Sequence, residues 1–184
     1  MSESALDEAV AALARGGIVA YPTEAVYGLG CDPGNETALG RLLALKERPA
    51  DKGLILIAAD LAALEPWLAP LDAALRARVA PTWPGPVTWL LPAGSGCPPR
   101  LRGAHETLAV RVTAHPIAAA LCTAWGGALV STSANASGGE PARDASAVRR
   151  LLGTRVDAII DGPVGGRERA TPIRDARTGR TVRE

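Results

Sequence analysis

The sequence contains no phenylalanine, and lysine supplies only two of its 20 basic residues. Aromatic residues make up 3% of the chain, so that a core must be built mainly from leucine, valine, isoleucine and alanine. With 47% hydrophobic residues and a mean hydropathy of +0.10, a chain of 184 residues can bury such a core. We therefore expect a single domain over residues 1–184.

Cysteine and histidine are also scarce. Cys31, Cys97 and Cys122 lie far apart without a CxxC pair, which excludes a disulfide framework and indicates reduced thiols. His105 and His115 have no cysteine or carboxylate at ligand spacing, so they do not predict a metal site, and metal ligands stay unassigned.

Long hydrophobic runs are missing too. The N-terminus is acidic and polar rather than apolar, and no run reaches the length of a membrane span. We expect a cytoplasmic protein.

Familiar catalytic motifs are absent. The chain has no GxxxxGK[ST] loop, no GxGxxG that opens a helix after a strand, and no GxSxG elbow. Without a paired cysteine or an activated serine, a covalent enzyme intermediate is not expected. Such a protein would instead orient its substrates and stabilise developing charge.

Hydrophobic spacing and capping residues predict alternating helices and strands. Helices are expected over residues 4–15, 35–47, 116–126 and 144–152, with short helices after Asp60 and Asp72. Strands are expected over residues 18–21, 54–58, 87–91, 108–112, 128–131 and 156–160, with a loop over 92–103 and one or two short strands in the tail. Several strands lack a crossover helix between them. This favours an α/β fold of the mixed α+β kind, a twisted sheet of parallel and antiparallel strands flanked by helices.

The two lysines lie six residues apart. Lys46 and Lys52 flank Arg48 and Pro49 on one short segment. Where arginine is the usual cation, a retained ammonium indicates a need for a compact charge with rotatable donors. The cluster predicts a phosphate clamp; the alternative is a solvated helix end.

Two expected strands run into segments rich in hydroxyl and amide groups. Residues 21–30 contain Thr23 and Glu24, and residues 131–139 contain Ser131, Ser133 and Asn135. Ligands of α/β sheets gather outside the carboxyl ends of strands, so both segments are candidate binding sites. The alternative is that these residues form turns and helix caps.

Trp83-Pro84-Gly85-Pro86 also has two interpretations. It is either a rigid turn that enters a strand or an aromatic platform for adenine, and the turn is favoured.

Five ordered motifs connect these segments. They are Tyr21-Pro22-Thr23-Glu24, Lys46-x-Arg48-Pro49, Trp83-Pro84-Gly85-Pro86-Val87-Thr88, Leu108-Ala109-Val110-Arg111-Val112 and Ser131-Thr132-Ser133-Ala134-Asn135. In these motifs the chain resembles the TsaC/YrdC family of threonylcarbamoyl-AMP synthases, in the short single-domain bacterial form. The resemblance covers roughly residues 5–180 and implies a YrdC-like fold.

The resemblance implies a reaction. L-threonine, bicarbonate and ATP would give L-threonylcarbamoyladenylate, pyrophosphate and water, with Mg²⁺ taking part of the phosphate charge. The product would serve the N6-threonylcarbamoyl modification of adenosine 37 in tRNAs that read codons starting with A. Other proteins of that pathway would carry out the later transfer to tRNA.

The resemblance also implies roles for the candidate residues. Lys46 and Arg48 would stabilise charge in catalysis, and with Lys52 they would hold the ATP phosphates. Thr107, Ser133 and Asn135 would contact the nucleotide. Thr23, Ser131 and Arg111 would bind threonine, with Arg111 pairing bidentately with its carboxylate. Glu24 would orient the lysine cluster.

Two positions depart from the family pattern. Where longer relatives have a histidine after the Lys/Arg loop, this chain has Leu56-Ile57-Ala58. Where a Ser-Thr pair is common near the C-terminus, this chain has Ala170-Thr171-Pro172, and only Thr171 keeps a hydroxyl.

Two other functions fit parts of the pattern. Residues 141–184 carry ten arginines against six acidic residues, which is compatible with a non-catalytic module that binds double-stranded RNA or tRNA. A carbamoyl-handling domain that acts on another amine is the second alternative.

Overall fold

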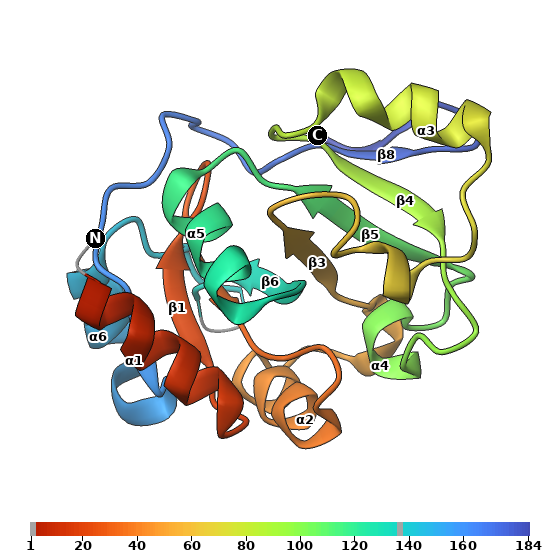
Figure 1. Cartoon of the computed structure of the whole chain (residues 1–184). Coiled ribbons are helices and arrows are strands. Elements are labelled where there is room, and N and C mark those ends of the chain that lie inside the picture. Colours follow the sequence, from red (N-terminus) through yellow and green to blue (C-terminus); the bar gives the residue numbers. More distant parts are fainter. Residues whose placement is uncertain (1–2, 136–137) are drawn as a thin grey trace.

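In the computed structural model, which describes residues 3–135 and 138–184, strands from all parts of the chain form one sheet (Figure 1). The helices are α1 (Glu3–Ala14), α2 (Glu36–Leu45), α3 (Ala73–Val79), α4 (Pro99–Arg102), α5 (Pro116–Trp125) and α6 (Ala145–Leu152). The strands are β1 (Val19–Pro22), β2 (Tyr27–Gly30), β3 (Ile55–Ala58), β4 (Thr88–Pro92), β5 (Thr107–Val112), β6 (Leu129–Ser133), β7 (Ala158–Ile159), β8 (Ile173–Asp175) and β9 (Thr181–Arg183). Short 3-10 helices lie at Ala50–Lys52, Glu65–Trp67, Ala80–Thr82 and Gly153–Arg155.

The sheet mixes both strand directions. Within the described residues its order is β7-β1-β2-β6-β3-β5-β4-β8-β9. The pairs β1–β7, β3–β5 and β4–β8 are parallel, and the remaining neighbours are antiparallel. The predicted mixed sheet with flanking helices is confirmed.

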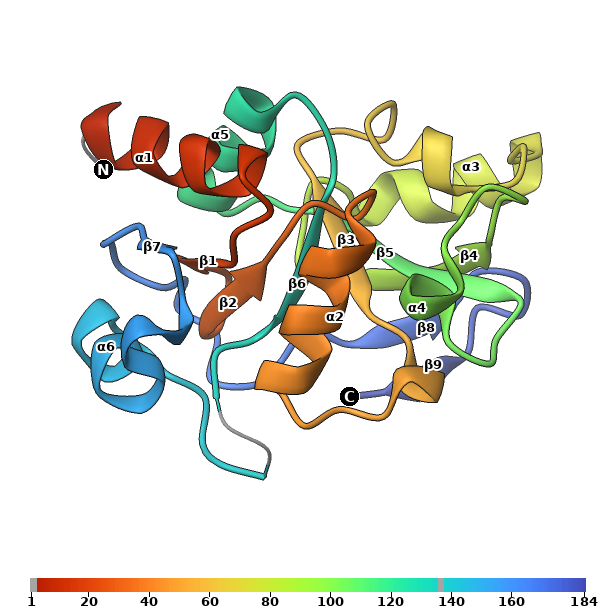
Figure 2. The ribbon, with the colours of Figure 1, turned by 90° about the horizontal axis from the view of Figure 1, so that it is seen from below.

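Alternation along the strands divides the core into two layers. On one face Tyr21, Ile57 and Leu129 pack with Leu13 of α1 and Leu121 of α5. Figure 2 shows α1 and α5 together on one side of the strands, and α2 and α6 below them.

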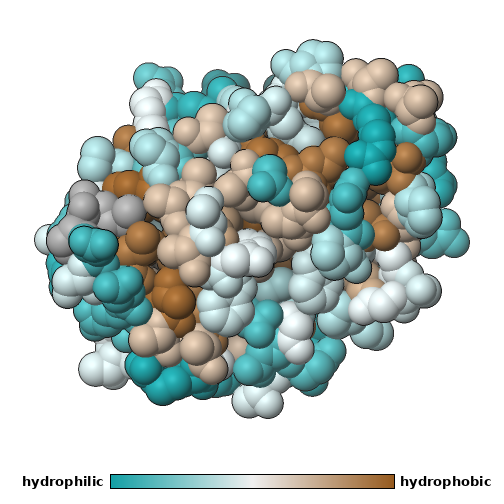
Figure 3. Space-filling view, in the orientation of Figure 1, coloured by the Kyte–Doolittle hydropathy of each residue, from teal (hydrophilic) through white to brown (hydrophobic). Residues whose placement is uncertain are grey.

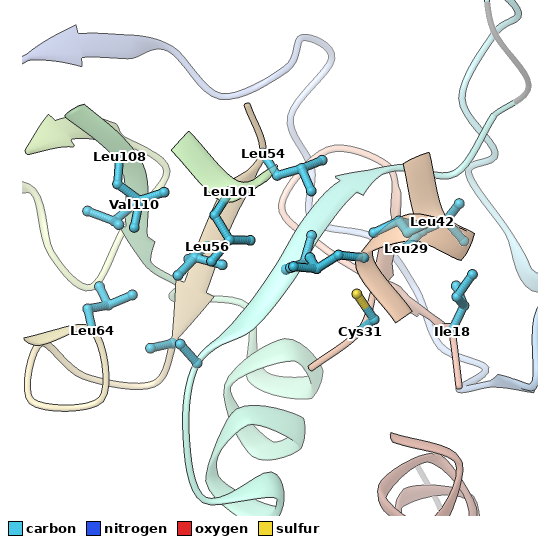
Figure 4. Packing of buried hydrophobic residues seen from close by; sticks show 14 of the residues in the cluster. Ile18, Leu29, Cys31, Leu42, Leu54, Leu56, Leu64, Leu101, Leu108 and Val110 are labelled. Carbon is cyan, nitrogen blue, oxygen red and sulfur yellow. The ribbon is translucent and has the colours of Figure 1, made fainter. Parts of the chain in front are cut away.

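The opposite face carries the larger core. Leu56 of β3 and Val110 of β5 belong to the same buried cluster as Leu42 of α2 and Leu101 of α4. Figure 4 shows Leu29, Cys31 and Leu42 beside α2, and Leu56, Leu101, Leu108 and Val110 beside β3 and β5. As expected from the scarcity of aromatic residues, this core consists mainly of closely packed aliphatic side chains.

Three helices begin at the residues that the sequence predicts. The side chains of Asn35, Asp72 and Asp144 accept hydrogen bonds from backbone N–H groups of Ala38 at 3.0 Å, Leu75 at 2.8 Å and Ala147 at 2.7 Å. Each cap satisfies an amide that the helix leaves free, and its loss costs about 1 kcal/mol.

Other expected elements are corrected. Residues 21–30 form a hairpin rather than a strand followed by an irregular segment, because β1 includes Pro22 and the chain turns back at once into β2. Tyr21 and Tyr27 are fully buried, so the two strands of the hairpin contribute to the core. The loop expected over 92–103 contains α4, Asp60 caps a turn rather than an α-helix, and the last expected strand shortens to Ala158–Ile159.

The Trp83–Pro86 segment is a turn. The indole Nε1 of Trp83 donates to Val87 O at 2.7 Å, so the ring folds back on its own segment and packs against the core. This geometry favours the rigid turn over the platform for adenine.

The surface has few large hydrophobic side chains. Among residues 3–135 and 138–184, those that are exposed are Leu151 and Val182. On the face shown in Figure 3, hydrophilic and hydrophobic residues are interspersed. None of the helices in these residues combines the length and the apolar character needed to cross a bilayer.

Candidate functional site

A cleft of about 480 Å³ lies over the strands β2, β6, β3 and β5. Five of the residues singled out from the sequence line it: Thr23, Arg48, Arg111, Ser131 and Ser133. They come from the β1–β2 turn, the segment after α2, and two strands. The structure therefore brings together residues that are up to 110 positions apart in the chain.

Strand register explains why these side chains meet. Ile55 of β3 is opposite Ser131 of β6 and also opposite Ala109 of β5. Because alternate residues of a strand point to the same face, Arg111 and Ser133 lie on the face that carries Ile55. If these strands were paired one residue out of register, the same side chains would point to the opposite face of the sheet, into the core.

Gly28 keeps the floor of the cleft open. A Cβ at this position would lie 3.1 Å from Cγ2 of Thr23 and 3.3 Å from Oγ of Ser131. Any side chain on Gly28 would therefore press on Thr23 and Ser131 and occupy the space between them.

Arg111 is held by a buried group of polar side chains. Its Nη1 donates to Oγ1 of Thr88 at 3.1 Å and to Oγ1 of Thr171 at 3.2 Å. Its Nη2 lies 3.3 Å from Oε2 of Glu24, and both side chains are less than a tenth exposed. For Arg111 to pair bidentately with a substrate carboxylate, at least one of these hydrogen bonds or the ion pair with Glu24 would have to break.

Glu24 has a second partner behind it. Oγ1 of Thr113 donates to Oε1 of Glu24 at 2.7 Å, and the backbone N–H of His115 donates to the same threonine oxygen at 3.1 Å. Burial raises the pKa of Glu24, but the Arg111 guanidinium and the Thr113 hydroxyl outweigh it, so the net pKa lies below its ordinary value. Glu24 is therefore an ionised carboxylate that faces Arg111. The predicted orientation of the lysine cluster by Glu24 is wrong, because these contacts direct it to Arg111.

The loop between β7 and β8 closes over Glu24. The backbone N–H of Gly165 donates to Thr23 O at 2.9 Å, and that of Arg167 donates to Glu24 O at 3.2 Å. A Cβ on Gly165 would lie 2.6 Å from Glu24 O, so only glycine allows this approach.

Lys46 is buried at the C-terminal cap of α2. Its Nζ donates to Ser133 O at 2.7 Å, to Asn135 O at 2.8 Å and to Oδ1 of Asn135. Burial and the neighbouring Arg48 guanidinium lower the pKa of Lys46 to about 8. Lys46 thus lies at the helix end, but it is not solvated there.

Arg48 is the cation of this segment that reaches the cleft. Its Nε donates to Gly53 O at 3.0 Å and its Nη2 to Lys52 O at 3.3 Å, which fixes the side chain along the turn. Burial lowers the pKa of Arg48 while Asp51 raises it, and the net shift is downward. The group stays charged, because a guanidinium is protonated at any physiological pH.

A second cavity of about 240 Å³ adjoins the cleft. Lys52 and Thr107 line this cavity, whereas Arg48, Leu54, Ile55 and Arg183 line both. Of the residues expected to contact the nucleotide, Ser133 therefore lies in the cleft, Lys52 and Thr107 lie in the second cavity, and Arg48 lies in both. Asn135 is absent from the described lining of both spaces, because its side chain bonds to Lys46 and Ser133 instead.

The second cavity is basic. Arg48, Lys52, Arg102, His105 and Arg183 line it, and no acidic residue is found among the described residues of its lining. Such a space suits a polyphosphate.

Arg183 was not predicted from the sequence. It lies on β9, at the end of the chain, and its Nη2 donates to Thr171 O at 3.3 Å. Burial lowers its pKa, and the charges of Arg48 and Arg111 lower it further. Three guanidinium groups that line one cleft, without a carboxylate in an ion pair with Arg48 or Arg183 among the described residues, indicate a place for an anion.

The sequence also missed the residues of two loops. Glu140, Arg143 and Glu168 line the cleft, and Nη2 of Arg143 donates to Glu168 O at 2.8 Å. Thr171 lines it as well, so the hydroxyl kept at that position does reach the site, through Arg111. Neither loop has a periodic pattern that could have identified these residues.

The carboxylates of Glu140 and Glu168 line the cleft. Within the described residues, no three His, Cys, Asp or Glu side chains form a group that could hold a metal ion. Mg²⁺ commonly keeps several waters and takes one or two carboxylates together with substrate phosphates. Glu140 and Glu168 are the carboxylates in the cleft lining that could serve in this way.

A family comparison covers almost the whole chain. The family model Sua5_yciO_yrdC, described as telomere recombination, matches residues 11–184.

Curated proteins with the name threonylcarbamoyl-AMP synthase are similar along their full length. The protein of Halorhodospira halophila is 59% identical over 175 residues, which cover 95% of this chain and 92% of that protein. The protein of Chromohalobacter salexigens is 55% identical over 185 residues, with 100% of both chains covered.

Solved structures share the fold. P. abyssi Sua5 complexed with L-threonine matches with a TM-score of 0.89 and 32% identity, over 95% of this chain and 52% of that chain. E. coli YciO matches with a TM-score of 0.87 and 29% identity, over 100% of this chain and 90% of the other. The present chain thus spans about half the length of the Sua5 protein.

Proposed function

Because this chain belongs to the Sua5/YciO/YrdC family, and full-length relatives are named threonylcarbamoyl-AMP synthase, we propose that it catalyses this synthesis. It is an enzyme of the nucleotidyltransferase type. L-threonine, bicarbonate and ATP would be converted to L-threonylcarbamoyladenylate, pyrophosphate and water. The cleft itself supports the proposal, because guanidinium groups that can hold anionic substrates meet there with hydroxyl groups that can orient them.

The reaction needs little covalent help from the protein. The amine of threonine and bicarbonate condense to a carbamate with loss of water. A carbamate oxygen then forms a bond to the α-phosphorus of ATP, and the bond from that phosphorus to the bridging oxygen of pyrophosphate breaks. Both reactants are anions, so cationic groups that hold them together and in line supply the catalysis.

The connected cavities suggest how the substrates divide between them. Arg48 and Arg183, which line both spaces, would hold the phosphates at the junction, with Lys52 and Thr107 along the second cavity. Thr23, Ser131 and Arg111 would receive threonine in the cleft. Mg²⁺ would enter with ATP and neutralise part of its charge.

The wider role follows from the same proposal. The adenylate would supply the N6-threonylcarbamoyl group of adenosine 37 in tRNA, and other proteins of that pathway would complete the transfer. A cytoplasmic location belongs to this proposal as well.

One assay tests the reaction. We expect pyrophosphate release from ATP that requires both L-threonine and bicarbonate, and that falls by about tenfold or more when serine replaces threonine. The discrimination reflects one methyl group, which is worth roughly 1–3 kcal/mol in an apolar contact.

Other results of this assay would favour other functions. Equal release with serine would contradict the threonine assignment, and release with a different amine alone would favour another carbamoyl substrate. Tight tRNA binding without pyrophosphate release would favour the RNA-binding module.

A further inference from the structure

We propose that Lys46 is a positioning residue, whose ammonium group fastens the turn Ser133–Asn135 at the rim of the cleft rather than contacting the phosphates. The proposal rests on the proposed function for its kinetic consequences. It replaces the direct phosphate contact that the sequence suggested for Lys46.

The donors of Lys46 are fully used. An ammonium group has three hydrogens, and Nζ of Lys46 has three oxygen partners: Ser133 O, Asn135 O and Oδ1 of Asn135. The residue is 7% exposed, and it is absent from the described lining of both cavities. A phosphate contact would require Lys46 to abandon one of these carbonyl oxygens in a buried place.

The turn that Lys46 fastens carries a residue of the cleft. Oγ of Ser133, which lines the cleft, donates to Oδ1 of Asn135 at 2.7 Å. That Oδ1 also accepts from Lys46, and Nδ2 of Asn135 donates to Gly139 O at 2.6 Å. The side chain of Asn135 is thus held at both ends, and it determines where the Ser133 hydroxyl points.

The anchor of Lys46 is rigid. Lys46 closes α2, where its backbone N–H donates to Leu42 O and Ala44 O. Leu39, Leu42 and Leu43 fix this helix in the core. A cation at the C-terminal end of a helix is also favoured by the helix dipole. The helix therefore ties the position of the turn to the packing of the sheet.

This geometry explains why a lysine stands here in a chain rich in arginine. Three acceptors from one tight turn converge on a single point, which suits a compact ammonium with tetrahedral donors. A planar guanidinium presents its donors in a fork and cannot meet all three oxygens from the same anchor.

Kinetics of four variants, Lys46→Met, Lys46→Arg, Asn135→Ala and the double variant Lys46→Met/Asn135→Ala, test the proposal, with pyrophosphate release as the readout. Lys46→Met, which keeps the length of the side chain, should lower kcat/KM for ATP by about 10- to 100-fold, the scale of a lost charged hydrogen bond. Lys46→Arg should lose nearly as much, because charge alone does not hold the turn. The double variant Lys46→Met/Asn135→Ala should lose no more kcat/KM for ATP than the more impaired of the two single variants, because both substitutions act through the same turn. The KM for threonine should stay within about twofold of wild type throughout.

A direct phosphate contact gives the opposite pattern. Lys46→Arg would then keep most of the activity, and the losses of Lys46→Met and Asn135→Ala would multiply in the double variant. Either result would overturn the positioning role.

Amide hydrogen exchange tests the same idea without turnover. The N–H of Ala134 donates to Tyr27 O at 2.8 Å and that of Asn135 to Ser133 O at 3.0 Å. In Lys46→Met these two amides should exchange at least about tenfold faster, while the core amide of Val130, which donates to Cys31 O at 3.1 Å, keeps its rate. Unchanged exchange at Ala134 and Asn135 contradicts the proposal even if the wild-type protein proves inactive in the assay. Faster exchange in a protein whose wild type releases no pyrophosphate would uphold the fastened turn and reject the proposed reaction instead.

Discussion

Replacing Arg48 by methionine is expected to slow pyrophosphate release by about 10²-fold or more. Arg48 lines both cavities, and its side chain is fixed by bonds to Gly53 O and Lys52 O. As a preorganised cation at the junction, Arg48 would stabilise charge on the phosphates without reorganisation during the reaction. The measurement is kcat for pyrophosphate release at saturating threonine, bicarbonate and ATP.

Stability should separate this effect from misfolding. Arg48 is half-buried and bonds to carbonyls of its own turn, so the free energy of unfolding in urea should change by no more than about 1 kcal/mol. The matched control is Arg150→Met, which removes a guanidinium from the exposed face of α6 and should keep the wild-type kcat. If Arg48→Met retains that rate as well, Arg48 has no part in the chemistry.

The second large effect is on stability. Glu24→Gln should lower the free energy of unfolding by about 3 kcal/mol, because it leaves the Arg111 charge buried without its anionic partner. The control is Glu65→Gln, which breaks the ion pair with Arg76 on the surface. Both partners there are nearly half exposed, so this change should cost less than about 1 kcal/mol. Equal costs for the two substitutions would contradict the account of the Glu24–Arg111 pair.

The same pair predicts a dependence on pH. The pKa of Glu24 in the folded protein lies below its ordinary value of 4.5. The stabilisation by ionised Glu24 is therefore fully present above that value and is lost as the pH falls through the folded pKa. The difference in unfolding free energy between wild type and Glu24→Gln should be constant above about pH 6 and should shrink below about pH 4.5. A difference that grows on acidification would show that the pKa of Glu24 is raised instead.

Local signals in the sequence predicted much of the fold. The caps Asn35, Asp72 and Asp144 are short-range features, and so are the start of α5 at Pro116 and its end at Gly126. The β1–β2 hairpin was missed because Pro22 suggested a break. The ring of Pro22 fixes φ and removes one backbone N–H donor. The last residue of a strand does not need that donor, so Pro22 can end β1. Short strands were expected in the tail, but their bounds were not, because β8 is ordered by pairing with β4 and β9 by pairing with β8.

The residues of the candidate site were predictable where they belong to one of the sequence motifs. Thr23, Arg48, Arg111, Ser131 and Ser133 do meet in one cleft. The sequence did not predict which groups each charged side chain contacts. Lys46 and Glu24 are charged residues next to the site, but burial and nearby partners direct one to a turn and the other to Arg111. Arg183 reaches the site only because β9 pairs at the edge of the sheet.

A crystal structure with L-threonine and a non-hydrolysable ATP analogue tests the central claim most directly. The account predicts phosphates against Arg48 and Arg183 at the junction of the two cavities, and threonine between Thr23, Ser131 and Arg111. Nucleotide bound away from these arginines, or threonine outside the cleft, would contradict it.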